Sequence, residues 1–257
     1  MPRSFRMLTN RLTLLLSLLL AAWTPALLAG EFAIVPLRVA LDRGTRSAEV
    51  TVRNDDRAPL RMQVEAMAWR QDADGKDRYE PTDGLIYFPR ALEIPPGESR
   101  IVRIGVRAAP VSREETYRLF IEQLPAPEQA AAAPAGASLL VLLRVGVPVF
   151  VAPAQSDRRG EVAQLDMKGG QALWTVANVG NVHFTADRVE LVAVSRDGSR
   201  LYAQQYQERY FLAGATKPLL AAIPRDLCPQ VAVLEAIVVG DDVDLRRKID
   251  VGPGACK

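Results

Sequence analysis

From about residue 30 onward, apolar positions alternate with polar ones, and helical periodicity is almost absent. In residues 47–53, Ala48, Val50 and Val52 fall on one face of an extended chain. Residues 60–69 repeat the pattern, with the apolar face formed by Leu60, Met62, Val64, Ala66 and Ala68. A period of two residues is typical of β-strands that bury one face. We therefore predict two strands here and expect them to pair antiparallel.

Further short runs rich in Val, Ile, Leu and Thr lie between clusters of Gly, Pro, Asn and Asp. In the first half of the chain these runs are residues 32–41, 84–88, 99–106, 116–124 and 139–151. In the second half they are residues 161–165, 171–178, 187–195, 198–204, 230–239 and 245–251. Seven short strands within about 120 residues suit an immunoglobulin-like sandwich, and a second, smaller sandwich follows. The sequence thus predicts an all-β protein.

Two proline-containing segments compete as the boundary between the sandwiches. Residues 125–137 are rich in Ala and Pro and are predicted to form a loop, because neither helix nor strand persists through three prolines. Residues 152–160 are polar and contain Pro153, and they follow the last strand of the first sandwich. We expect domains at 30–152 and 153–257.

The first residues resemble a secretory signal peptide. Arg3, Arg6 and Arg11 precede an apolar run at 12–23, and small residues follow at Ala26 and Ala29. The apolar run is shorter than the roughly 20 residues that a membrane-spanning helix needs. We expect cleavage after a signal at 1–29 and no membrane insertion afterwards, although an uncleaved N-terminal anchor is the alternative.

The net charge and the cysteine content argue against nucleic-acid binding and against a metal site. The formal net charge is +2, and removal of the three signal arginines leaves 2 − 3 = −1, so nucleic acid is not an expected partner. Cys228 and Cys256 are the only cysteines, and export to an oxidising compartment favours a disulfide between them. Together with the single histidine, His183, they provide too few ligands for a metal site.

Catalytic motifs are scarce in this sequence. It contains no glycine-rich phosphate loop, no nucleophile elbow and no His/Cys cluster. The adjacent acids Asp55–Asp56 and Asp241–Asp242 are typical of solvated turns. We expect no catalytic residues, no cofactor and no enzyme activity.

Residues 139–151 are apolar on both faces, whereas a sandwich strand normally has one face in water. If one face packs inward, the other is an exposed apolar stripe formed by Leu139, Val141, Leu143, Val145 and Val147. Such a strand could pair with another chain. Alternatively, the second domain covers both faces, and composition alone does not separate the two possibilities.

Five motifs, in this order behind a signal peptide, resemble the periplasmic chaperones of the chaperone-usher pathway, the PapD-like family, and within it the archaic branch. The motifs are Pro36-Leu37-Arg38-Val39, Pro89 with Ile94-Pro95-Pro96-Gly97-Glu98-Ser99-Arg100-Ile101-Val102-Arg103, Tyr117-Arg118-Leu119-Phe120-Ile121-Glu122-Gln123-Leu124-Pro125, Val147-Pro148-Val149-Phe150, and Asn178-Val179-Gly180-Asn181-Val182-His183. The resemblance implies a periplasmic protein of two immunoglobulin-like sandwiches arranged as a boomerang. It also implies pilus or fimbrial subunits and an outer-membrane usher as partners.

The resemblance further implies donor-strand complementation, in which the last strand of the first domain fills the groove of an incomplete subunit. Leu139, Val141 and Leu143 match the family's donor positions, on the strand that continues through Val145 and Val147. Arg38 matches one of two basic residues that bind the subunit's terminal carboxylate. The second basic position falls on Pro148, so Arg144 or Arg118 is expected to replace it.

The resemblance also implies an ion network between the two domains, formed by Arg103, Glu114 and Asp241. The function expected from the sequence is therefore a subunit-binding chaperone. The alternative is a structural or adhesive sandwich module of the cell surface, which would not need an available donor strand.

Overall fold

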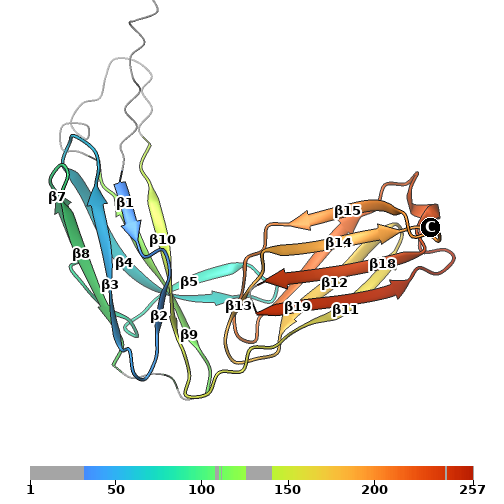
Figure 1. Cartoon of the computed structure of the whole chain (residues 1–257), viewed down its shortest axis with the longest axis horizontal. Helices are drawn as coiled ribbons and strands as arrows, with labels where there is room; N and C mark the ends of the chain where they lie inside the picture. Colours follow the sequence, from blue (N-terminus) through green and yellow to red (C-terminus); the bar gives the residue numbers. More distant parts are fainter. Residues whose placement is uncertain (1–31, 108–109, 111, 126–140, 241, 257) are drawn as a thin grey trace, which may run out of the picture. The chain divides into compact units, whose positions relative to one another are not determined.

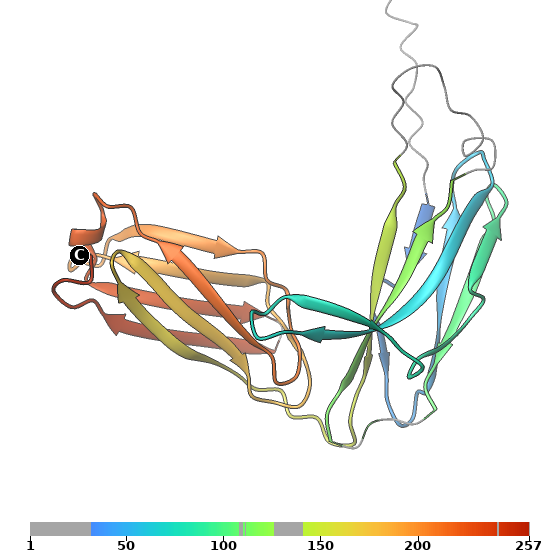
Figure 2. The same cartoon turned by 180° about the vertical axis from the view of Figure 1, so that it is seen from behind.

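The computed structural model describes residues 32–257, except 108–109, 111, 126–140, 241 and 257. The predicted signal peptide and most of the predicted Ala- and Pro-rich loop lie outside the described residues. The described chain is almost entirely β-structure, with a single short 3₁₀ helix, η1 (Cys228–Gln230). Figures 1 and 2 show it from opposite sides. Among the described residues, no helix is long and apolar enough to cross a membrane.

Two sheets form the first sandwich. One has the order β1-β3-β8-β6, and the other has the order β2-β10-β9-β4-β5, with β7 also paired to β4. The strands are β1 (Phe32–Val35), β2 (Val39–Leu41), β3 (Ser47–Asn54), β4 (Leu60–Gln71), β5 (Asp77–Pro81), β6 (Ile86–Phe88), β7 (Ala91–Ile94), β8 (Ser99–Gly105), β9 (Glu115–Gln123) and β10 (Arg144–Val151).

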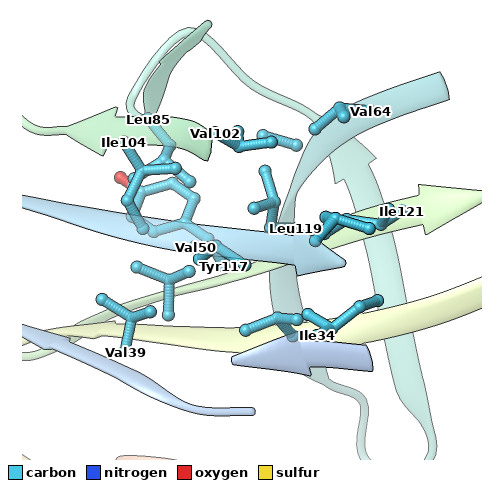
Figure 3. Close-up of a cluster of buried hydrophobic side chains, with 14 of the residues drawn as sticks. Ile34, Val39, Val50, Val64, Leu85, Val102, Ile104, Tyr117, Leu119 and Ile121 are labelled. Atoms are coloured by element: carbon cyan, nitrogen blue, oxygen red, sulfur yellow. The ribbon is translucent and has the colours of Figure 1, made fainter. Parts of the chain in front are cut away.

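The alternating apolar faces predicted from the sequence form the core of this sandwich. Val50 and Val52 of β3 are fully buried, and so is Met62 of β4. Figure 3 shows Val50, Val64, Val102, Leu119 and other side chains of the two sheets gathered in one cluster. The expected pairing of β3 with β4 is wrong, because the two strands belong to opposite sheets. Their apolar faces meet across the core.

The predicted first strand, residues 32–41, is interrupted at Pro36. Its first part, β1, pairs antiparallel with β3 in one sheet, and its second part, β2, pairs parallel with β10 in the other. A proline has no amide proton to donate to a sheet, so the chain changes sheets there. The result is that β2 has only three residues.

The second sandwich is formed by the sheets β11-β12-β17 and β15-β14-β18-β19, with the small pair β13-β16. Its strands are β11 (Gly160–Lys168), β12 (Gln171–Asn178), β13 (Phe184–Thr185), β14 (Arg188–Val194), β15 (Arg200–Tyr206), β16 (Tyr210–Phe211), β17 (Thr216–Ala222), β18 (Val233–Gly240) and β19 (Val243–Asp250). Trp174, Phe184, Phe211 and Leu191 fill its core. We propose the link between β10 and β11 as the domain boundary, at 152–153.

The expected disulfide between Cys228 and Cys256 is present, and it confirms that prediction. It joins η1 to the C-terminal segment, whose Ala255 carbonyl also accepts a hydrogen bond from the amide of Gly170. A crosslink that closes a loop of 28 residues contributes about 3–4 kcal/mol in the chain-entropy account. The disulfide thus fastens the end of the chain to the second sandwich.

Candidate functional site

One edge of β10 is only partly paired. β9 pairs with β10 along its whole length, from Arg144 to Val151. On the other side β2 covers only Val149–Val151. Within the part of the chain that the structure describes, residues 144–148 therefore have no strand on their second edge. We call this side of residues 141–148 the open edge.

Hydrogen bonds at the two ends of β10 show which backbone groups face the open edge. The Gln123 amide donates to the Leu143 carbonyl on the β9 side, and the Ala152 amide donates to Leu41 on the β2 side. Because successive residues of a strand point their backbone groups to alternate edges, the amides of Leu142, Arg144 and Gly146 face the open edge. Pro148 has no amide proton, so Gly146 is the last residue of this segment that can donate a backbone hydrogen bond at the open edge.

The predicted apolar stripe is exposed at one end only. Val141 is 65% exposed and Leu143 is 47% exposed. Val145 is half-buried against the core of the first sandwich, and Val147 is buried within it, with 1% exposure. The expectation that Val145 and Val147 belong to an exposed stripe is thus wrong. Their face of β10 is the one that packs inward, and only Val141 and Leu143 extend beyond the sandwich. Leu139 lies outside the described residues.

Arg38 and Arg118 lie on either side of Pro148, with Arg118 on β9 and Arg38 directly before β2. Pro148 of β10 is the direct cross-strand partner of Arg118 on β9. On the other side Val149 pairs with Val39, which places the preceding residue, Arg38, beside Pro148. Neighbouring strands are about 4.8 Å apart, so the two arginine backbones are separated by roughly 10 Å. Two guanidinium groups at this spacing can reach one carboxylate.

Arg118 is held by aromatic rings and a carbonyl. Its guanidinium carbon lies 3.9 Å from the centre of the Trp69 ring, and one terminal nitrogen donates to the Gly146 carbonyl at 3.0 Å. Among the described residues Arg118 forms no ion pair. The pKa of the nearby Tyr79 is raised, mainly by burial and next by the negative charge of Asp77. The positive charge of Arg118 partly offsets this rise in the Tyr79 pKa.

Arg144 differs from Arg118 because its charge is already balanced. Its guanidinium lies 3.3 Å from Glu65 on β4 and 3.3 Å from Glu122 on β9. It also covers the ring of Phe120, with 4.0 Å between the guanidinium carbon and the ring centre. Of the two arginines that the sequence left open, Arg118 has the charge that is not compensated within the described chain.

The predicted ion network between the sandwiches is not formed as expected. Arg103 is 78% exposed and pairs with Glu49, its cross-strand neighbour within the first sandwich. Asp241 lies outside the described residues. Glu114 does contact the second sandwich, but its partner is His183: the carboxylate accepts the His183 amide at 2.8 Å and lies 2.8 Å from its Nδ1.

An aromatic cluster that sequence reasoning missed surrounds this contact. Phe150 of β10 stacks on His183, with ring centres 3.5 Å apart, and also packs near Trp69 and Tyr210. Trp69, Phe150, Leu212 and Ala215 form a separate buried group. The only local signal was the set of large aromatic residues at strand ends, which does not reveal their partners.

These features define a class of protein: a pair of β-sandwiches in which a half-open strand carries exposed apolar side chains beside two arginines. Residues 31–157 match the family described as pili and flagellar-assembly chaperone, PapD N-terminal domain. The matched segment includes all ten strands of the first sandwich. No curated protein matches the chain.

Solved structures of the same fold are similar over nearly their whole length. A chain of the CsuC–CsuE chaperone–tip adhesion subunit complex from archaic chaperone-usher pili of Acinetobacter baumannii matches with a TM-score of 0.57 and 16% identity, covering 85% of this chain and 97% of that one. A chain from the Salmonella enterica SafA pilin–SafB chaperone complex matches with a TM-score of 0.54 and 16% identity, over 87% and 99%.

A Pseudomonas aeruginosa chaperone, CupB2, matches with a TM-score of 0.52 and 17% identity, over 86% of this chain and 100% of that one. The matched segment, which is the whole first sandwich, belongs to the PapD-like family of pilus-assembly chaperones, and the chain as a whole has the fold of the solved chaperones. The alternative of a structural or adhesive surface module is not favoured by these matches.

The contact between Glu114 and His183 leads to a first prediction. The Glu114 side chain is 3% exposed, so Glu114→Ala leaves the His183 amide without its acceptor and should lower the free energy of unfolding by about 1.5–3 kcal/mol. Glu114→Gln keeps an acceptor oxygen and should cost less. Arg103→Ala removes an exposed pair and should cost below about 1 kcal/mol. Urea denaturation measures all three, and equal losses for Arg103→Ala and Glu114→Ala would contradict this assignment.

Proposed function

We propose that this chain is a periplasmic chaperone that captures an unfinished pilus subunit by donating the segment around Val141 and Leu143 to the subunit's missing strand position. The observation that carries the proposal is the open edge of β10, which combines backbone amides without a strand partner among the described residues with exposed apolar side chains. Natural proteins usually protect such an edge. An edge left available is suited to strand addition.

The geometry explains how the donated segment would bind. The amides of Leu142, Arg144 and Gly146 face the open edge and would pair with a subunit strand. Val141 and Leu143 lie on the face of the strand that continues into the core through Val147 and Val149. An incomplete subunit seated there would extend this hydrophobic core, and each fully buried side chain of this size contributes roughly 1.5–3 kcal/mol.

The row of Arg38, Pro148 and Arg118 would bind the subunit's terminal carboxylate. Charge-assisted hydrogen bonds to guanidinium groups are stronger than neutral ones. Arg118 is the better second basic residue because Arg144 is already paired with Glu65 and Glu122. In this proposal the carboxylate fixes the register of the subunit, and the apolar side chains supply most of the affinity.

The remaining parts of the proposal follow from the family. Delivery to an outer-membrane usher, cleavage of a signal at 1–29 and residence in the periplasm are what the resemblance implies. The proposed activity is binding without covalent chemistry. Membership of the archaic branch is likewise what the resemblance implies.

The donor segment is tested by Val141→Asp. Val141 is mostly exposed, so the substitution should change the free energy of unfolding by less than about 0.5 kcal/mol. In the complex it would bury a carboxylate in an apolar groove, and affinity for the subunit should fall at least about a hundredfold. The measurement is periplasmic co-expression with pilus subunits from the same genome, followed by affinity purification and titration.

Leu220→Asp is the matched control, because Leu220 is 54% exposed on the second sandwich, away from the open edge. It should capture the subunit as the wild type does. A folded Val141→Asp variant that still recovers stoichiometric, soluble subunit would refute the donor-segment assignment.

The choice between Arg118 and Arg144 is tested by replacing each with glutamine. Arg118→Gln should weaken subunit binding about tenfold or more, as expected for the loss of a hydrogen bond to a charged group. Arg144→Gln should change it by less than about threefold, because that guanidinium is engaged by two glutamates. Titration of the purified variants with one subunit gives both values, and the opposite order would identify Arg144 as the second basic residue.

A further inference from the structure

We propose that Trp69 and Tyr210 are positioning residues that hold the Arg118 guanidinium in place, so that the second sandwich contributes to recognition of the subunit's terminal carboxylate. The inference rests on the proposed function. It adds that a residue outside the donor domain sets the strength of the carboxylate site.

Two aromatic rings contact the same guanidinium. The guanidinium carbon of Arg118 lies 3.9 Å from the centre of the Trp69 ring and 5.4 Å from that of Tyr210. The two rings meet edge to face, with 5.3 Å between their centres. Trp69 belongs to β4 of the first sandwich and Tyr210 to β16 of the second. Attraction between a cation and a ring face operates within about 6 Å.

The rings, together with the Gly146 carbonyl, restrain the arginine, and much of this group is buried. Trp69 is 1% exposed. Arg118 Nε and Trp69 Nε1 are both buried, and neither has a hydrogen-bond partner among the described residues. Guanidinium is weakly hydrated and stacks well on aromatic faces, which makes such a site tolerable for arginine and poor for lysine.

The two arginines differ in whether their charge is available to a ligand. Arg144 pairs with two carboxylates, which neutralise its charge. Rings restrain Arg118 without neutralising it, so its charge remains available to an anionic ligand beside Arg38. Restraining the side chain in advance also reduces the entropy lost on binding.

Tyr210 is itself fixed relative to the first sandwich. The Gln71 side chain, at the end of β4, donates to the Tyr210 carbonyl at 2.9 Å and accepts the Leu212 amide at 3.0 Å. Gln71 lies two residues after Trp69 on the same strand. The end of β4 therefore determines the positions of both the Trp69 ring and the Tyr210 ring. The Arg118 guanidinium is thus placed by residues of both sandwiches.

A double-mutant cycle tests the inference. Tyr210→Leu removes the ring and should weaken binding of the subunit recovered by co-expression about threefold to tenfold. Tyr210→Phe is the control, since it keeps the ring, and the Tyr210 hydroxyl makes no hydrogen bond with described residues. In an Arg118→Gln background, Tyr210→Leu should have no further effect, because a positioning residue acts only through the group it positions. Tyr210→Met repeats the test if Tyr210→Leu does not fold.

Each result decides the matter. An unchanged affinity for Tyr210→Leu, or an equal loss with and without Arg118, overturns the inference and leaves the proposed function intact. If Arg118→Gln binds the subunit with wild-type affinity, Arg118 is not part of the carboxylate site and the inference is overturned. The donor segment is then still tested by Val141→Asp. Failure of the wild-type chain to capture any subunit refutes the proposed function, and the inference with it.

Discussion

The structure depends on unequal pairing along β10. β9 satisfies one edge of this strand over all eight residues, whereas β2 satisfies the other edge over only three. Pro36 is the cause, because the first extended segment is divided there between two sheets and leaves only Val39–Leu41 for β10. The unpaired part of the edge lies directly next to the exposed Val141 and Leu143. A longer β2 would close the edge that the proposed function needs.

The same strand links three parts of the protein. Its beginning carries the open edge, its middle lies in the row with Arg38 and Arg118, and its end places Phe150 against His183 of the second sandwich. A rigid strand, paired throughout with β9, therefore sets the distances between the apolar segment, the basic row and the aromatic contact. In the proposed function, this arrangement would let one bound subunit terminus make apolar and charged contacts together.

Much of the fold was predictable because its causes are local. Alternation identified β3 and β4, and export with two cysteines identified the disulfide. Five strands escaped detection. β5 exposes every residue, and β17 contains Pro218, which interrupts a strand pattern. The other three, β7, β13 and β16, have only two to four residues, too few to show an alternation. The expected pairing of β3 with β4 failed because alternation identifies a buried face but not the sheet to which a strand belongs.

The candidate site was predictable only in part. Several of its contacts depend on which residues lie opposite each other in neighbouring strands, and the sequence does not show this. Whether Val147 faces the core follows from how β10 pairs with β9, and Arg103 meets Glu49 only because those residues are directly opposed. The contact of Arg118 with Tyr210 joins residues from different sandwiches, and no local pattern reports it.

The most direct test of the central claim is residue-resolved amide hydrogen exchange by NMR, on the free chain and on its complex with a pilus subunit. The amides of Leu142, Arg144 and Gly146 should exchange rapidly in the free protein and become protected in the complex. The amides of Val145 and Val147, which face β9, should be protected in both states. A stable complex in which the Leu142, Arg144 and Gly146 amides exchange as fast as in the free chain would contradict strand addition at the open edge.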